Sequence, residues 1–167
     1  GYRHLNEVVT WNRAVFEAVY DELTAGRLPL MMGGDHSLAI GSISAVARYC
    51  RERGRKLRIL WFDAHADFNT SAITPSGNLH GMPAACLCGF GPPALVELSG
   101  TVPAIDAGEI RQIGIRSVDE GEKRFLGEQG IEVFDMRYID EIGMRRTLEL
   151  ALAGVDEATH LHVSLDV

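Results

Sequence analysis

The residues Asp63-Ala64-His65-Ala66-Asp67 directly follow the apolar run Leu57-Arg58-Ile59-Leu60-Trp61-Phe62. A short, mostly apolar run of this kind predicts a buried strand. Because side chains alternate along an extended chain, Asp63, His65 and Asp67 are expected to point to one side of it. Two carboxylates and an imidazole at the end of a strand favour a divalent metal ion, so this stretch predicts part of a metal site.

Helices and strands are expected to alternate along the rest of the chain. Expected helices cover residues 7–25, 37–53, 120–127 and 147–153, with a short one after Pro83, and expected strands cover residues 28–32, 57–62, 110–115, 131–134 and 160–167. Ser37 is the expected cap of the second helix. Alternation of this kind predicts an α/β fold with a mostly parallel sheet and helices on its faces.

The composition is that of one ordinary globular domain. The 167 residues are 46% hydrophobic and 23% charged, and no run approaches the roughly 18 apolar residues that a membrane span needs. A net charge of −7 argues against a nucleic-acid partner, which favours a basic surface. The three cysteines give no disulfide framework and are expected to be packed thiols in a reducing compartment. We therefore expect a cytoplasmic protein with neither a membrane nor a nucleic-acid partner.

Polar side chains are associated with three of the expected strands. Gly33-Gly34-Asp35-His36-Ser37 follows the first strand, residues 63–67 follow the second, and Asp166 lies on the last. Ligands bind at the carboxyl ends of the strands in an open parallel sheet, and the two glycines allow a sharp turn that brings His36 to this edge. Five metal-capable residues can therefore meet there: His36, Asp63, His65, Asp67 and Asp166. Asp35 is not counted among them, because it can be a turn residue or a group that supports the metal ligands.

This set of donor groups indicates the kind of metal. Several carboxylates with imidazoles and no thiolate favour Mn²⁺ ahead of Zn²⁺. Five ligands are too many for one ordinary catalytic ion, but they suit a pair of ions about 3.5–4 Å apart that share carboxylates and a water molecule. The sequence therefore predicts two Mn²⁺ ions in one site.

Three blocks of the chain resemble the signature blocks of the ureohydrolase family, which includes arginases and agmatinases. They are residues 33–37, residues 63–67 and Ser164-Leu165-Asp166-Val167, in the family's order, and the resemblance covers essentially the whole chain. The resemblance implies a three-layer α/β/α arginase-type fold with a mostly parallel sheet. It also implies a binuclear Mn²⁺ centre held by the five residues above, and a homo-oligomer that is a trimer or a hexamer.

The same resemblance implies that residues 1–167 are a single catalytic domain that is truncated. The family's final block continues to a second Asp, one residue beyond Val167, and an N-terminal strand region normally precedes the part seen here. A chain that ends at Val167 is therefore expected to bind its second metal ion poorly and to be inactive.

The loop after Asp67 bears on the substrate. Its residues Asn69, Ser76, Asn78 and His80 resemble the arginase version of this loop rather than the agmatinase version. Neutral amide and hydroxyl donors suit the carboxylate of an α-amino acid, whereas agmatine has no carboxylate and would leave them unpaired. A loop rich in Asn and Ser can also simply form turns.

A second substrate loop is expected within residues 112–122. By resemblance, Asp119 contacts the α-amino group of the substrate, and Glu122 lies nearby. Ser117 and Glu120 depart from the family pattern, in which an acidic residue and a proline are common at these two positions.

These residues lead to the hypothesis that the protein hydrolyses L-arginine to L-ornithine and urea by means of a metal-bridging hydroxide. Asp67 would hold that hydroxide by a hydrogen bond while binding metal, and His80 would protonate the leaving amine, because an imidazole titrates near neutrality. Agmatinase, guanidinobutyrase and formiminoglutamase are alternatives with the same metal centre, and a non-catalytic arginase-fold subunit is another. A nucleotide-binding domain is excluded because neither a G-x-G-x-x-G nor a G-x-x-x-x-G-K-[ST] pattern follows any expected strand.

Overall fold

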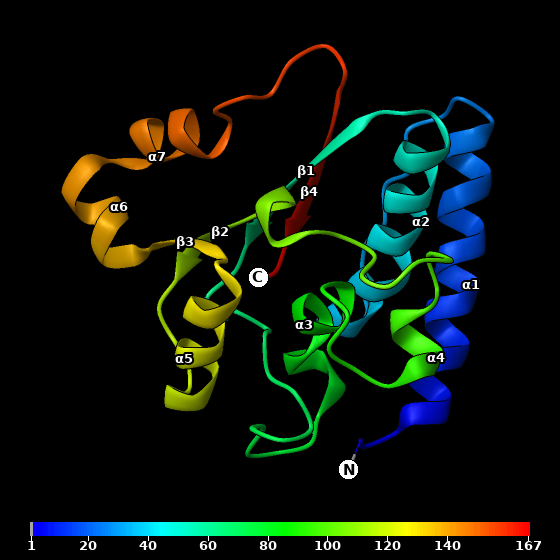
Figure 1. The fold of residues 1–167 in the computed structure, drawn as a ribbon, viewed down its shortest axis with the longest axis horizontal. Coiled ribbons are helices and arrows are strands. Elements are labelled where there is room, and N and C mark those ends of the chain that lie inside the picture. Colours follow the sequence, from blue (N-terminus) through cyan, green and yellow to red (C-terminus); the bar gives the residue numbers. More distant parts are fainter. Residues whose placement is uncertain (1) are drawn as a thin grey trace.

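A four-stranded parallel sheet forms the centre of the protein in the computed structural model, which describes residues 2–167 (Figure 1). The strands are β1 (Lys56–Phe62), β2 (Ile110–Ile115), β3 (Glu132–Asp135) and β4 (Thr159–Leu165). Their order in the sheet is β3-β2-β1-β4, and every neighbouring pair is parallel. The carboxyl ends of all four strands therefore share one edge, as the sequence predicts.

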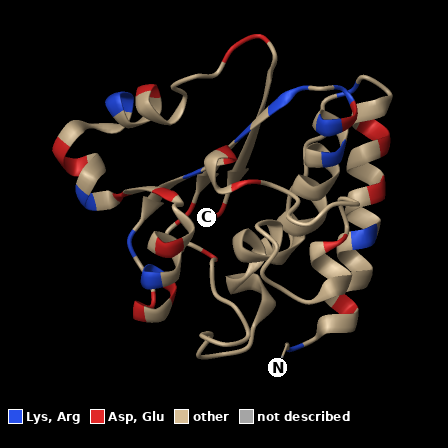
Figure 2. Cartoon of the chain, in the orientation of Figure 1, with Lys and Arg blue, Asp and Glu red and all other residues tan. Residues whose placement is uncertain are grey.

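Helices cover both faces of this sheet. They are α1 (Leu5–Thr24), α2 (Ala39–Glu52), α3 (Pro83–Leu87), α4 (Pro93–Val96), α5 (Glu120–Gln129), α6 (Met136–Ile142) and α7 (Met144–Ala151), with 3₁₀ turns at η1 (His36–Leu38), η2 (Leu79–Gly81) and η3 (Ala107–Glu109). The helices α1 and α5 carry charged residues, whereas α3 carries none (Figure 2). None of the helices within residues 2–167 is both long and apolar enough to cross a membrane.

Alternate residues of β1 belong to different cores. Ile59 and Trp61 pack in the core that includes α2 and α5, whereas Leu60 packs in a second core with residues of α6 and α7. Side chains of a strand point alternately to the two faces of its sheet, so these cores lie on opposite faces. The predicted three-layer α/β/α arrangement is therefore confirmed, and α1 and α2 lie across the sheet from α6 and α7 (Figure 1).

Most of the expected elements are present with shifted ends, but the predicted cap of the second helix is wrong. Asp35, rather than Ser37, caps the segment: its Oδ1 accepts the backbone N–H of Ser37 at 3.0 Å, and the helix begins as η1 before continuing as α2. The short helices α4 and α6 are not among the elements expected from the sequence.

The predicted strand at residues 28–32 is wrong. The segment forms no strand, and Leu28, Leu30 and Met32 are exposed. A strand needs a neighbour that accepts and donates its backbone hydrogen bonds, and this segment instead faces β4 across a groove of about 490 Å³. Its apolar composition predicts burial but cannot supply that neighbour.

The helices α1 and α2, which precede and follow residues 33–37 in the sequence, are in close contact. The side-chain oxygen of Asn12, which is fully buried in α1, accepts the backbone N–H of Gly41 at 2.6 Å. A Cβ atom at Gly41 would overlap the backbone carbonyl oxygen of Asn12. Only glycine lets these two helices approach so closely.

Replacing Gly41 by alanine should therefore destabilise the protein, by about 1–3 kcal/mol, because backbone atoms cannot give way as side chains do. Gly127→Ala in α5 is the matched control, because a Cβ atom there meets no other atom within 4 Å. The control should be neutral or stabilise the protein by up to about 1 kcal/mol, since alanine is the better helix former. Urea unfolding of both variants measures the difference, and equal stability of the two would contradict this account of the helix contact.

Candidate active site

The register between β1 and β4 brings two carboxylates together. Phe62 and Leu165 are paired residues at the ends of these strands, so Asp63 and Asp166 follow at the same level of the sheet. The backbone N–H of Asp166 donates to the carbonyl oxygen of Phe62 at 2.9 Å, which continues the pairing beyond the strands. Two residues separated by about a hundred positions thus become neighbours.

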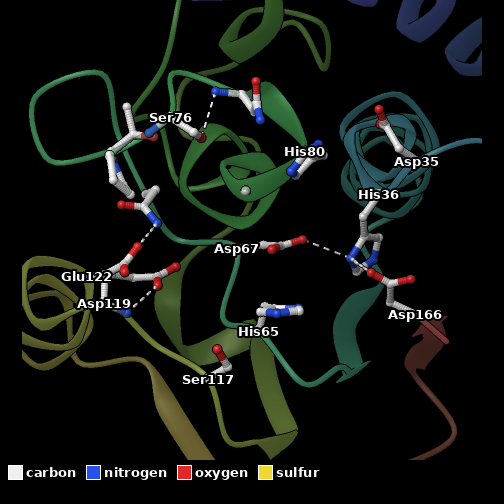
Figure 3. A pocket seen from close by; sticks show the side chains of 15 residues that line it. Asp35, His36, His65, Asp67, Ser76, His80, Ser117, Asp119, Glu122 and Asp166 are labelled. Carbon is white, nitrogen blue, oxygen red and sulfur yellow. Dashed lines mark hydrogen bonds and ion pairs between the residues drawn. The ribbon is translucent and has the colours of Figure 1, made fainter.

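His36 lies over this edge, on η1. Its ring stacks on Trp61 of β1, with the ring centroids 4.1 Å apart. The Nδ1 atom lies 2.9 Å from Asp67 Oδ2 and 3.5 Å from Asp166 Oδ2 (Figure 3). It also lies 3.0 Å from Asp63 Oδ2, while Nε2 lies 2.9 Å from the hydroxyl of Ser164.

Four of the five predicted ligands gather in this cluster. The donor atoms of His36, Asp63, Asp67 and Asp166 all lie within 4.8 Å of one another. The fifth, His65, does not belong to this cluster: its side chain is 59% exposed, although its Nδ1 lies 3.5 Å from Asp63 Oδ1. His65 nonetheless lines the same pocket.

The charged groups of the cluster shift the pKa values of one another. Burial lowers the pKa of His36, but the hydrogen bond to Asp63 and the negative charges of Asp63 and Asp67 outweigh it and raise that pKa to about 9. Burial raises the pKa of Asp63, yet the contacts with His36 and with the backbone N–H of His65 outweigh burial and lower it. Asp67 behaves oppositely, because burial and the nearby charge of Asp63 raise its pKa.

The cluster fits a divalent cation. Three carboxylates surround Nδ1 of His36, and one ring nitrogen carries at most one proton to share among them. The Oδ2 atom of Asp67 is buried and accepts no well-directed hydrogen bond from the described residues. Buried carboxylates that outnumber the available cations are costly unless they are paired or bind a metal. A set of oxygen donors with one imidazole nitrogen suits Mn²⁺ and similar ions.

A pocket of about 350 Å³ opens beside the cluster. It is lined by Asp35, His36, His65, Asp67, Asn69, Thr74, Pro75, Ser76, Asn78, His80, Gly81, Ser117, Asp119, Glu122 and Asp166. All six residues expected beyond the metal ligands, in the two substrate loops, are among them. In Figure 3, Asp119 and Glu122 lie apart from His36 and Asp166, with Asp67 between the two groups.

Hydrogen bonds link the two substrate loops. The Nδ2 atom of Asn69 donates to Asp119 Oδ2 at 3.2 Å, and Asn69 is buried while its Oδ1 accepts no bond from the described residues. The hydroxyl of Ser76 accepts the backbone N–H of Asn78 at 3.2 Å. The alternative that these residues form turns is therefore partly correct, because Ser76 does stabilise a local turn.

Glu122 forms hydrogen bonds with the backbone of both substrate loops, in addition to its predicted place near the substrate. It is buried, its Oε1 accepts the backbone N–H of Phe68 at 2.7 Å, and its Oε2 accepts that of Asp119 at 3.3 Å. Burial raises the pKa of this carboxyl, although the two backbone bonds oppose the rise. The pair Asp119 and Glu122 forms the capping box at the start of α5, which the spacing of an acidic residue and a Glu three positions later could have signalled.

Two further contributors went unrecognised in the sequence. Trp61 donates its indole N–H to Asp63 Oδ2 at 3.2 Å, and Gln112 donates its side-chain amide to the carbonyl oxygen of Ala66 at 2.5 Å. Neither contact has a sequence signal, because both depend on how neighbouring strands align.

Comparison with known proteins agrees with this geometry. The model of the arginase family matches residues 3–167. The chain belongs to the arginase family. It is 43% identical to an arginase of Bacillus caldovelox over 166 residues, which is 99% of this chain and 54% of that protein.

Solved structures of family members superpose closely. The solved structure of a Bacillus caldovelox arginase gives a TM-score of 0.90 at 43% identity, over 99% of this chain and 54% of the other. An arginase of Entamoeba histolytica, solved in complex with L-ornithine, gives 0.88 at 33% identity, covering 99% of this chain and 56% of the other. The chain thus spans about half the length of the relatives it matches.

The cluster should bind Mn²⁺ in solution. Isothermal titration should show binding to the wild-type chain, and His36→Ala should weaken it by at least about tenfold, because the imidazole is replaced by an apolar group. His4→Asn is the control: it changes a histidine outside the pocket, and Asn tolerates the left-handed backbone found at His4. Mn²⁺ binding of equal strength in wild type and His36→Ala would remove His36 from the site.

Proposed function

We propose that the protein hydrolyses the guanidinium group of L-arginine to give L-ornithine and urea. The observation that carries the proposal is one pocket with a carboxylate–imidazole cluster in one part and polar groups suited to an amino acid in another. Membership of the arginase family and relatives named arginase support it. The longer relatives extend beyond the matched half, so the proposal concerns the whole natural protein.

The cofactor we propose is a pair of Mn²⁺ ions, held by His36, Asp63, His65, Asp67 and Asp166. Bound there, the metal supplies a water activated for attack on a carbon that resonance makes a poor electrophile. Asp67 has a further role, because its carboxylate can accept a hydrogen bond from the attacking water and so orient it.

The carboxylate of the substrate is assigned to Asn69, Ser76 and Asn78. These groups donate hydrogen bonds without adding charge, which suits one carboxylate that must be held but not neutralised. Asp119 is assigned to the α-amino group, with Glu122 beside it. The Entamoeba histolytica relative, which binds L-ornithine, supports an amino acid as the ligand of this pocket.

His80 is assigned the last proton transfer. It lies on η2 at the wall of the pocket, exposed to solvent. After water adds to the guanidinium carbon, the bond from that carbon to the ornithine nitrogen breaks, and the departing nitrogen needs a proton. An imidazole is suited to deliver it near neutral pH, directly or through a water molecule.

A comparison of substrates tests this function. The polypeptide expressed from the complete gene and loaded with Mn²⁺ should release urea from L-arginine with a kcat/KM at least about 100-fold above that for agmatine, because agmatine leaves the carboxylate donors unpaired. Asn78→Ala should lower kcat/KM for L-arginine by about tenfold and leave that for agmatine unchanged.

The outcomes separate the alternatives. Preference for agmatine would keep the metal chemistry but assign Asn69, Ser76 and Asn78 to turns alone. Absence of urea release from either substrate would favour a non-catalytic member of the family.

A further inference from the structure

Asp67 has a backbone conformation that residues other than glycine rarely adopt. Its φ angle is +49°, in the left-handed region, and within residues 2–167 only one other non-glycine residue, His4, has a positive φ. This conformation costs free energy, so surrounding contacts have to hold it. It matters here because the carboxylate of Asp67 approaches His36 from this turn.

Gln112 holds the peptide group before Asp67. It lies on β2, is fully buried, and donates from Nε2 to the carbonyl oxygen of Ala66 at 2.5 Å. The Oε1 atom of the same side chain is buried and accepts no hydrogen bond from the described residues. A buried oxygen without a partner costs free energy. The hydrogen bond to Ala66 is therefore the favourable one that this side chain makes, and it is to the metal loop, residues 63–67.

Glu122 holds the peptide group after Asp67. Its Oε1 accepts the backbone N–H of Phe68 at 2.7 Å, while its Oε2 accepts that of Asp119 at the start of α5. The carbonyl oxygen of Asp67 itself accepts the N–H of Ala84 at 3.0 Å, at the start of α3. The turn is thus fixed from three elements that are distant in sequence.

We propose that Gln112 and Glu122 are positioning residues that keep Asp67 in its left-handed conformation and so aim its carboxylate at the metal cluster. Loss of either contact lets the backbone of Asp67 relax to an ordinary conformation, which carries the carboxylate away from His36. The consequence for metal rests on the proposed function, whereas the consequence for the backbone does not.

Variants that remove the hydrogen bonds but keep the bulk of the side chain test the inference. Gln112→Met removes the donor to Ala66, and Glu122→Met removes the acceptor for Phe68. Glu109→Met is a matched control, because Glu109 forms the same kind of capping box and its Oε2 accepts the backbone N–H of Asp106 at 2.8 Å. Glu109 precedes β2, at the end of the sheet opposite the metal loop.

Nuclear magnetic resonance of the metal-free protein measures the backbone conformation of Asp67 directly. The three-bond coupling that reports φ of Asp67 should change in both test variants. The amide hydrogen of Phe68 should exchange with solvent at least about tenfold faster in Glu122→Met, because it loses its acceptor. Neither quantity should change in Glu109→Met. An Asp67 coupling that stays at its wild-type value in both test variants overturns the inference.

The affinity for Mn²⁺ measures the effect of these variants on the metal site. The dissociation constant should rise about 10–100-fold in Gln112→Met and Glu122→Met, as for other residues that orient metal ligands, and stay within about twofold of wild type in Glu109→Met. In an Asp67→Gly background, where there is no carboxylate to aim, Glu122→Met should have no further effect. An equal effect in both backgrounds overturns the proposed route through Asp67.

Two further outcomes remain decisive. If a methionine variant fails to fold, Glu122→Gln retains one acceptor oxygen and should give an intermediate affinity; wild-type affinity and an unchanged Phe68 exchange rate would count against the inference. If wild-type protein binds no Mn²⁺, the proposed function fails, and the resonance measurements still decide whether Gln112 and Glu122 set the conformation of Asp67.

Discussion

The parallel pairing of β1 with β4 is the constraint on which the rest of the site depends. It sets Asp63 level with Asp166, and the capped turn at Asp35 then brings His36 over both. The result is a concentration of negative charge around one imidazole nitrogen. Such a cluster is costly in a metal-free protein, since three carboxylates cannot share one proton well. The cluster lies at one edge of the sheet, where the carboxyl ends of the strands meet and a ligand can bind.

Much of this arrangement can be predicted from the sequence. The run 57–62 followed by alternating polar residues identifies both β1 and the candidate metal ligands at its end, because burial and the two-residue repeat of a strand are local properties. The alternation of helices and strands then identifies a parallel sheet whose functional edge collects residues from separate loops. For these reasons the sequence alone groups five residues, His36, Asp63, His65, Asp67 and Asp166, and the structure brings together all of them except His65.

Other features depend on non-local alignment and could not be predicted. The segment 28–32 is apolar and short, like a buried strand, but it lacks a hydrogen-bonding neighbour and stays irregular. The left-handed turn at Asp67 gives no sequence signal, because the usual marker, glycine, is absent from that position. The contact of Gln112 with Ala66 follows from the pairing of β2 with β1, and no short sequence motif predicts that pairing. Whether His65 completes the ligand set stays a prediction.

The position of bound metal would show whether these carboxylates form a metal site. Crystals of the protein grown with Mn²⁺ and measured with X-rays that excite anomalous scattering by manganese would locate each ion. We expect at least one strong peak within about 2.5 Å of Nδ1 of His36 and of carboxylate oxygens of Asp63, Asp67 or Asp166, in the range of ordinary nitrogen and oxygen ligands. Carboxylates that remain paired with His36 at high Mn²⁺ concentration, with no peak among them, would contradict it.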